Sequence, residues 1–136
     1  MYGAILNVKF TVVVHSAPYS TQAAASAYRF TKALLEQGHD VYRLFFFGDG
    51  VHNTSKLTVV AQDDTNWQQQ WDKLIELQKL DSVVCVTSAI KRGIIDEAES
   101  ARHELGAVSL SSSSEISGLG QLIDATINSD RVINFG

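Results

Sequence analysis

The sequence has 136 residues, with 11 lysines and arginines against 15 aspartates and glutamates, so its formal net charge is −4. That length suits one domain and is hard to divide into two. A hydrophobic fraction of 45% with 19% charged residues excludes wholesale disorder. Because the charge balance is acidic and no basic stripe is present, we expect no direct contact with nucleic acid.

The single cysteine excludes an intramolecular disulfide framework, and it excludes a zinc site built from two of the chain's own thiolates. No run reaches the ~18 consecutive apolar residues of a membrane helix, so we expect no membrane association. Met1–Asn7, interpreted as an N-terminal extension, lacks positive charge and is a weak secretory signal. Together with the lone thiol, these features predict a cytoplasmic protein.

In the first half of the chain, β-branched apolar runs alternate with a segment of helical period. The apolar residues Ala27, Phe30 and Leu34 recur at helical spacing, and Gly38 can end the helix. The predicted elements are a buried strand at Val8–Val14, a loop at His15–Ser20, a helix at Thr21–Gln37, and a second strand at Val41–Phe47 that ends at Gly48-Asp49-Gly50.

The second half begins with an irregular segment, Val51–Gln62, and then continues the alternation. The predicted elements are a helix at Asn66–Lys79, a strand at Ser82–Val86, a helical turn at Ser88–Arg92 closed by Gly93, a helix from Asp96 to about Leu105, a short strand near Ser113–Ile116, a helix at Gly118–Ile127 and a strand at Arg131–Phe135.

Strands that alternate with helices at this spacing predict βαβ units with right-handed crossovers. We therefore expect a single α/β domain over residues 1–136. Its sheet would be mainly parallel, with about five strands and with helices on both faces.

Cys85 is the first candidate for chemistry, because ligands and reactive groups gather beyond the carboxyl ends of parallel strands. It ends the third predicted strand, just before a short helix, and Lys91 and Arg92 follow closely in the sequence. A helix start and nearby cations both favour the thiolate over the thiol. The alternative is that Cys85 is an inert core residue, since free cysteine is often fully buried.

Other candidate sites are weaker. The four histidines, including His15 and His52 on presumed strand-end loops, lack metal-ligand spacing, so we expect no metal. Gly48-Asp49-Gly50 and Gly118-Leu119-Gly120 lack the full dinucleotide fingerprint, so we expect no cofactor.

Aromatic residues are abundant for so small a core. Phe45, Phe46, Phe47, Trp67 and Trp71 therefore include a candidate docking surface for a partner protein.

The run Val84–Glu99, with Cys85 near its start and Arg102 just after it, resembles the active-site segment of the DsrE/TusD sulfurtransferase family. Lys91 departs from that pattern, since relatives often carry a second arginine there. The resemblance extends over nearly the whole chain and leaves out Met1–Asn7 and the serine-rich stretch. The other matching segments are Ala17–Gln22, Ser26–Phe30, Gly38–Asp40, Leu44–Val51, Ile116–Leu122 and Asp130–Phe135.

The resemblance implies a flavodoxin-like fold of the DsrE type and a persulfide-carrying nucleophile at Cys85, with Lys91 and Arg92 as candidate stabilisers of its thiolate. It also implies TusB-like and TusC-like subunits in a heterohexamer, a TusA-like sulfur donor and a TusE-like acceptor. The pathway would be 2-thiolation of the tRNA wobble uridine or, for a DsrE-like subunit, dissimilatory sulfur oxidation. A non-catalytic assembly subunit is the remaining alternative.

Overall fold

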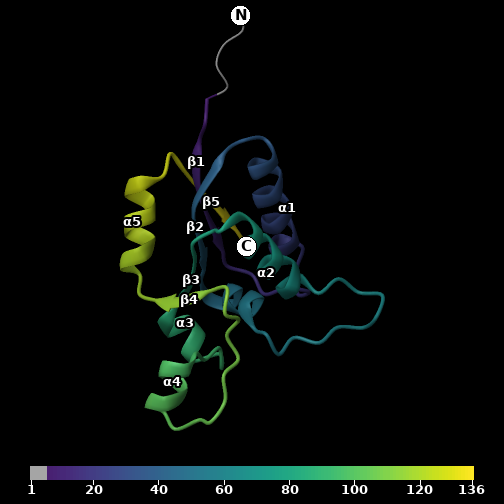
Figure 1. The fold of residues 1–136 in the computed structure, drawn as a ribbon, viewed down its shortest axis with the longest axis vertical. Coiled ribbons are helices and arrows are strands. Elements are labelled where there is room, and N and C mark those ends of the chain that lie inside the picture. The colour runs from purple at the N-terminus through teal and green to yellow at the C-terminus, as the bar shows by residue number, and fades with distance from the viewer. Residues whose placement is uncertain (1–5) are drawn as a thin grey trace, which may run out of the picture.

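Five parallel strands form one sheet in the structure, a computed structural model that describes residues 6–136 (Figure 1). In chain order the elements are β1 (Lys9–Val14), α1 (Ala23–Glu36), β2 (Asp40–Phe46), the 3₁₀ helix η1 (Gly48–Thr54), α2 (Trp67–Gln78), β3 (Ser82–Cys85), α3 (Val86–Ile90), α4 (Glu97–Arg102), β4 (Glu115–Ser117), α5 (Gly120–Asn128) and β5 (Arg131–Phe135).

The strand order across the sheet is β4-β3-β2-β1-β5, so β1, β2 and β3 are the inner strands. The register pairs Val14 with Phe46, Phe46 with Val84, and Cys85 with Ser117. Because all the pairs are parallel, the carboxyl ends of the five strands meet along one edge of the sheet.

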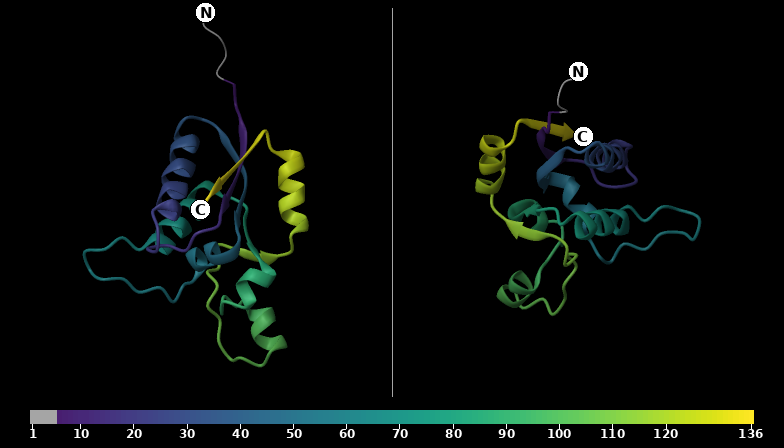
Figure 2. Two further views of the ribbon diagram at one scale, coloured as in Figure 1. Left: turned by 180° about the vertical axis from the view of Figure 1, so that it is seen from behind. Right: turned by 45° about the horizontal axis from the view of Figure 1, so that its top comes forward.

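Helices cover both faces of the sheet, with α1 and α2 on one face and α5 on the other (Figure 2). Side chains that alternate along the inner strands divide the core accordingly. Val12, Val14, Phe46 and Val84 belong to the larger cluster. The smaller cluster consists of Val13, Phe45, Val83 and Cys85, with Phe47, Leu122 and Val132 packed against it.

The α/β fold expected from the sequence is confirmed: five strands, all parallel, lie between helices on both faces. The local differences concern short elements. Gly48–Thr54 forms a 3₁₀ helix where an irregular segment was expected, and α3 begins at Val86, directly after Cys85. The predicted strand near Ser113 is shifted to Glu115–Ser117, and α4 ends at Arg102. Five residues of the expected N-terminal extension, 1–5, lie outside the described residues.

Of the five aromatic residues expected to include a docking surface, three lie in the core and cannot belong to such a surface. Phe45, Phe46 and Trp71 are almost completely buried, and the ring of Trp71 packs edge-to-face on Phe46 at 5.3 Å between centroids. Phe47 and Trp67 are half-buried. These rings therefore serve mainly the two core clusters rather than an exposed surface.

Within residues 6–136, no helix combines the length and the apolar character that crossing a bilayer requires.

Candidate functional site

Cys85 is the last residue of β3 and the residue that precedes the first turn of α3, at the carboxyl edge of the sheet. Its side chain points to the face that α5 covers, in the cluster that Phe47 and Leu122 complete. The residue is 1% exposed. This burial is shallow, because the exposed Thr87 places its Oγ1 3.4 Å from the cysteine Sγ.

The surroundings of the sulfur favour its ionised form. Burial raises the pKa of the Cys85 thiol, but hydrogen bonds from the hydroxyl groups of Ser88 and Thr87 and from their backbone N–H groups outweigh it. The pKa therefore lies below its ordinary value. Hydrogen bonds to a charged group favour that group's charged state, so the site is suited to holding a thiolate.

Ser88 is a candidate site residue that the sequence interpretation did not include. Its Oγ accepts a hydrogen bond from the backbone N–H of Gly48 at 3.0 Å, which leaves the hydroxyl proton free for the sulfur of Cys85. Ser88 is buried in the first turn of α3. Hydroxyl residues directly after a cysteine at a strand end were the available signal, since the first helical turn brings them back towards it.

The two predicted cations take different places. Arg92 donates from Nε to Asp49 Oδ1 at 2.8 Å and from a terminal nitrogen to the Ser88 carbonyl at 3.2 Å, so it links η1 to α3. This pairing lowers the pKa of the Asp49 carboxyl. Lys91 is exposed at the end of α3. Neither cation is among the groups that lower the pKa of Cys85, so their stabilising role stays a prediction.

Of the two strand-end histidines, His15 contacts Phe47, which packs against the cluster that contains Cys85. Its ring packs edge-to-face on Phe47 with 5.7 Å between centroids, and its Nε2 is 2.9 Å from Asn134 Oδ1. His52 lies in η1. In the described part of the chain, no three His, Cys, Asp or Glu side chains gather as a metal site would require.

Ser88 offers a direct test of this electrostatic description. Replacing it by alanine removes a hydroxyl donor from the Cys85 sulfur, so the pKa of the thiol is expected to rise. The thiolate fraction at neutral pH would fall, and alkylation by iodoacetamide would slow with it. The pH dependence of the alkylation rate measures the pKa; Thr65→Ala, at an exposed hydroxyl before α2, is the control. An unchanged pH midpoint in Ser88→Ala would contradict the assignment.

Known proteins resemble this chain over almost its whole length. The model of the DsrE/DsrF-like family matches residues 8–135. "Putative sulfurtransferase DsrE" of Allochromatium vinosum is 46% identical over 95% of this chain and 99% of its own length. "Sulfurtransferase TusD homolog" of Pseudomonas aeruginosa is 40% identical over 95% of this chain and 98% of its own length.

Among solved structures, the YchN protein of E. coli superimposes with a TM-score of 0.76 at 25% sequence identity, covering 94% of this chain and 99% of that one. The names of the curated relatives support the sulfurtransferase class expected from the residues around Cys85. Because the family model matches the chain from the start of β1 to the end of β5, the chain belongs to the DsrE/DsrF-like family.

Proposed function

We propose that this chain is a sulfur-relay subunit in which Cys85 accepts a sulfane sulfur as a persulfide and passes it to a partner protein. The observation that carries the proposal is a thiol with a lowered pKa at the carboxyl edge of the sheet, surrounded by hydroxyl and amide donors. An inert core cysteine does not need donors that stabilise its thiolate. A cysteine that attacks sulfur needs them, because the ionised fraction of the thiol determines its reactivity.

The reaction needs no redox partner. The Cys85 thiolate attacks the outer sulfur of a donor persulfide, R–S–SH; a new S–S bond forms at Cys85 while the donor's S–S bond breaks. The products are Cys85–S–SH and the donor thiolate, and the proton remains on the transferred sulfur. In the second step an acceptor thiolate attacks the outer sulfur of the Cys85 persulfide, and Cys85 leaves as the thiolate. Both steps use the same cysteine, so one cysteine is sufficient.

The partners are proposed from the family resemblance. The donor would be TusA-like and the acceptor TusE-like, and TusB-like and TusC-like chains would complete a heterohexamer in the cytoplasm. The product pathway would then be 2-thiolation of the tRNA wobble uridine.

One observation favours a second pathway. The chain shares 46% identity with the DsrE relative, against 40% with the TusD homolog of Pseudomonas aeruginosa. A DsrE-like subunit of dissimilatory sulfur oxidation would use the same cysteine. Genes for siroheme sulfite reductase subunits beside this gene would favour oxidation, and their absence would favour tRNA thiolation.

The persulfide itself provides the test. After incubation with a persulfide donor, intact-mass measurement is expected to show the gain of one sulfur atom that a thiol reductant removes. Cys85→Ser is expected to gain none. The measurement is made on the chain alone and on its complex with companion subunits. A wild-type protein that stays unmodified in both forms, with a Cys85 inert to alkylation, would instead support a non-catalytic assembly subunit.

We keep Lys91 and Arg92 as proposed stabilisers of the Cys85 thiolate, because a positive charge can act through space on a nearby thiolate. Their role can be tested separately from that of the hydroxyl donors. Lys91→Gln removes a positive charge without touching the Arg92–Asp49 pair. If Lys91 helps to stabilise the thiolate, this variant raises the pKa of Cys85, measured by the pH dependence of alkylation. An unchanged midpoint would remove Lys91 from the site.

A further inference from the structure

Cys85 is nearly inaccessible in this structure, although sulfur transfer requires contact with another protein's sulfur. The residue is 1% exposed, and Phe47 and Leu122 pack against the cluster that contains it. Phe47 follows an inner strand and its N–H is bonded to the Val14 carbonyl at 3.0 Å. Leu122 belongs to α5, the helix on this face of the sheet, so movement of α5 would remove part of the cover of the cluster that contains the sulfur.

Apolar packing holds α5 only weakly. Ala125 is the buried residue of its nine, whereas Leu122 is half-buried. Leu119, Ile123 and Ile127, spaced four residues apart, turn outwards, and Ile127 is 76% exposed. A helix with so little buried apolar surface is a candidate for local opening at low free energy.

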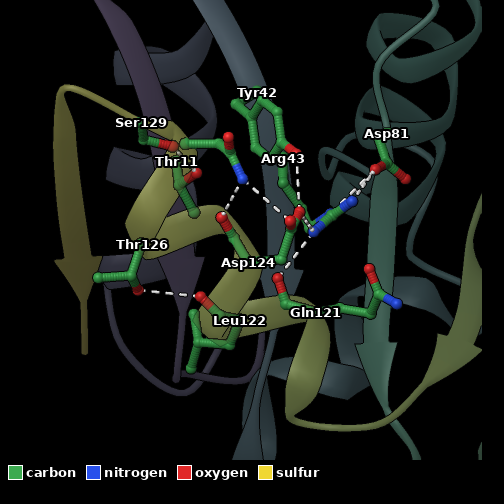
Figure 3. A network of polar contacts seen from close by, with 10 residues as sticks. Thr11, Tyr42, Arg43, Asp81, Gln121, Leu122, Asp124, Thr126 and Ser129 are labelled. Atoms are coloured by element: carbon green, nitrogen blue, oxygen red, sulfur yellow. Dashed lines mark hydrogen bonds and ion pairs between the residues drawn. The ribbon is translucent and has the colours of Figure 1, made fainter.

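The buried Arg43 attaches α5 to the sheet through polar contacts, where apolar packing is weak (Figure 3). Arg43 of β2 donates from one terminal nitrogen to the Gln121 carbonyl at 2.7 Å and to Asp124 Oδ2 at 3.0 Å, both on α5. Its other nitrogens are anchored to Asp81 Oδ2 at 2.9 and 2.7 Å, at the start of β3. The Tyr42 hydroxyl donates to the same Asp124 oxygen at 2.7 Å.

Two glycines that this conformation does not require lie at the start of α5, Gly118 in the loop before it and Gly120 as its first residue. A Cβ built at Gly118 or Gly120 would meet no atom of residues 6–136 within 4 Å, and neither residue has a φ in the left-handed region. Both follow Ser117, the residue that pairs with Cys85. Glycines that relieve no clash and adopt no special φ contribute backbone freedom, which is the property of a hinge.

We propose that Arg43 is a positioning residue that holds α5 closed over Cys85, and that the chain opens at Gly118–Gly120 to expose the sulfur to its partner. The purpose of the opening rests on the proposed function, whereas the opening itself does not. Arg43 acts through Gln121 and Asp124, so weakening these contacts exposes Cys85 without altering the hydroxyl and amide donors around it.

The test is the rate at which iodoacetamide alkylates Cys85 in the folded chain, measured by intact mass over a range of pH and of urea below the unfolding transition. Asp124→Asn leaves the shape of the side chain but removes its charge, and the alkylation rate is expected to rise about tenfold. The pH midpoint is expected to stay in place, because the donors to the sulfur are untouched. The wild-type rate should depend little on urea, as local opening exposes little surface.

Two further variants separate the attachment from the hinge. Asp130→Asn is the matched control, since its carboxylate accepts from Lys9 N at 2.8 Å, away from Arg43, and its alkylation rate should equal that of wild type. Gly118→Ala with Gly120→Ala is expected to raise the urea midpoint while slowing alkylation. A merely structural role would couple these two quantities in every variant, with faster alkylation whenever stability falls and slower alkylation whenever it rises. The factor by which Asp124→Asn raises the alkylation rate must therefore exceed the factor by which it raises the equilibrium constant for global unfolding.

An alkylation rate that follows global unfolding in wild type and in Asp124→Asn would overturn the inference. That result leaves the persulfide measurement unaffected. Conversely, fast local alkylation with no persulfide formation would sustain the movement of α5 and refute the proposed function.

Discussion

Replacing Gly50 by alanine is expected to prevent stable folding. An ideal Cβ at this position would lie 1.9 Å from the Val14 carbonyl oxygen and 2.7 Å from the Val14 carbonyl carbon. Both are backbone atoms of the inner strand β1, which is paired on its two sides to β2 and β5. The strand cannot move aside without breaking that pairing, so we expect a loss of about 4 kcal/mol or more.

Such a loss approaches the whole free energy of unfolding of an ordinary domain, about 5–15 kcal/mol. Urea unfolding followed by circular dichroism measures it, and recovery in the insoluble fraction is the expected result if the loss exceeds the stability. Gly118→Ala is the matched control, because a Cβ there would meet no atom of the described residues within 4 Å. This variant should fold with stability unchanged or raised by about 0.4–1 kcal/mol. A Gly50→Ala protein as stable as wild type would contradict the close approach of η1 to β1.

Truncating Trp71 is expected to give the second large effect. Its side chain is 1% exposed and packs against Phe46 at 5.3 Å and Tyr28 at 5.3 Å, so it joins α2 to both β2 and α1. Trp71→Ala would leave a large cavity in the main cluster and cost about 3–5 kcal/mol. The urea midpoint and its slope measure this loss.

The companion variant Trp71→Phe distinguishes packing from polarity. Among the described residues, the indole Nε1 of Trp71 finds no hydrogen-bond partner, so the wild-type protein already bears the cost of burying it. Phenylalanine removes that group and keeps much of the ring, so its loss should be well below that of alanine. Equal losses in the two variants would show that the indole nitrogen is satisfied in solution.

The fold was predictable because its strands carry long β-branched and apolar runs. Val12, Val13 and Val14 are buried on alternate faces of the sheet, as the continuous run in Val8–Val14 indicates for an inner parallel strand. The short elements were less predictable. Glu115–Ser117 has three residues and follows a serine-rich stretch, so its position is determined by pairing with Val83–Cys85 rather than by its own sequence.

The site was predictable in part. The location of Cys85 at a strand end follows from the alternation of elements, and the depth of its burial does not, since Leu122 lies 37 positions further along the chain. The pairing of Arg92 with Asp49 was also not predictable, because it joins η1 to the turn after α3, which lie 43 positions apart in the sequence. Its place in the sequence suggested that Arg92 lies near the thiol, but the ion pair with the Asp49 carboxylate determines where its guanidinium lies.

The arrangement of donors around Cys85 also bears on how long sulfur would stay there. Ser88 and Thr87 aim their hydroxyl and amide protons at the position of Sγ itself. In a loaded subunit the negative charge would move to the terminal sulfur, about 2 Å farther out, where donors fixed on Sγ stabilise it less. If Cys85 carries sulfur as proposed, these donors would favour the thiolate of the unloaded cysteine over the ionised persulfide, and the subunit would release sulfur quickly rather than store it.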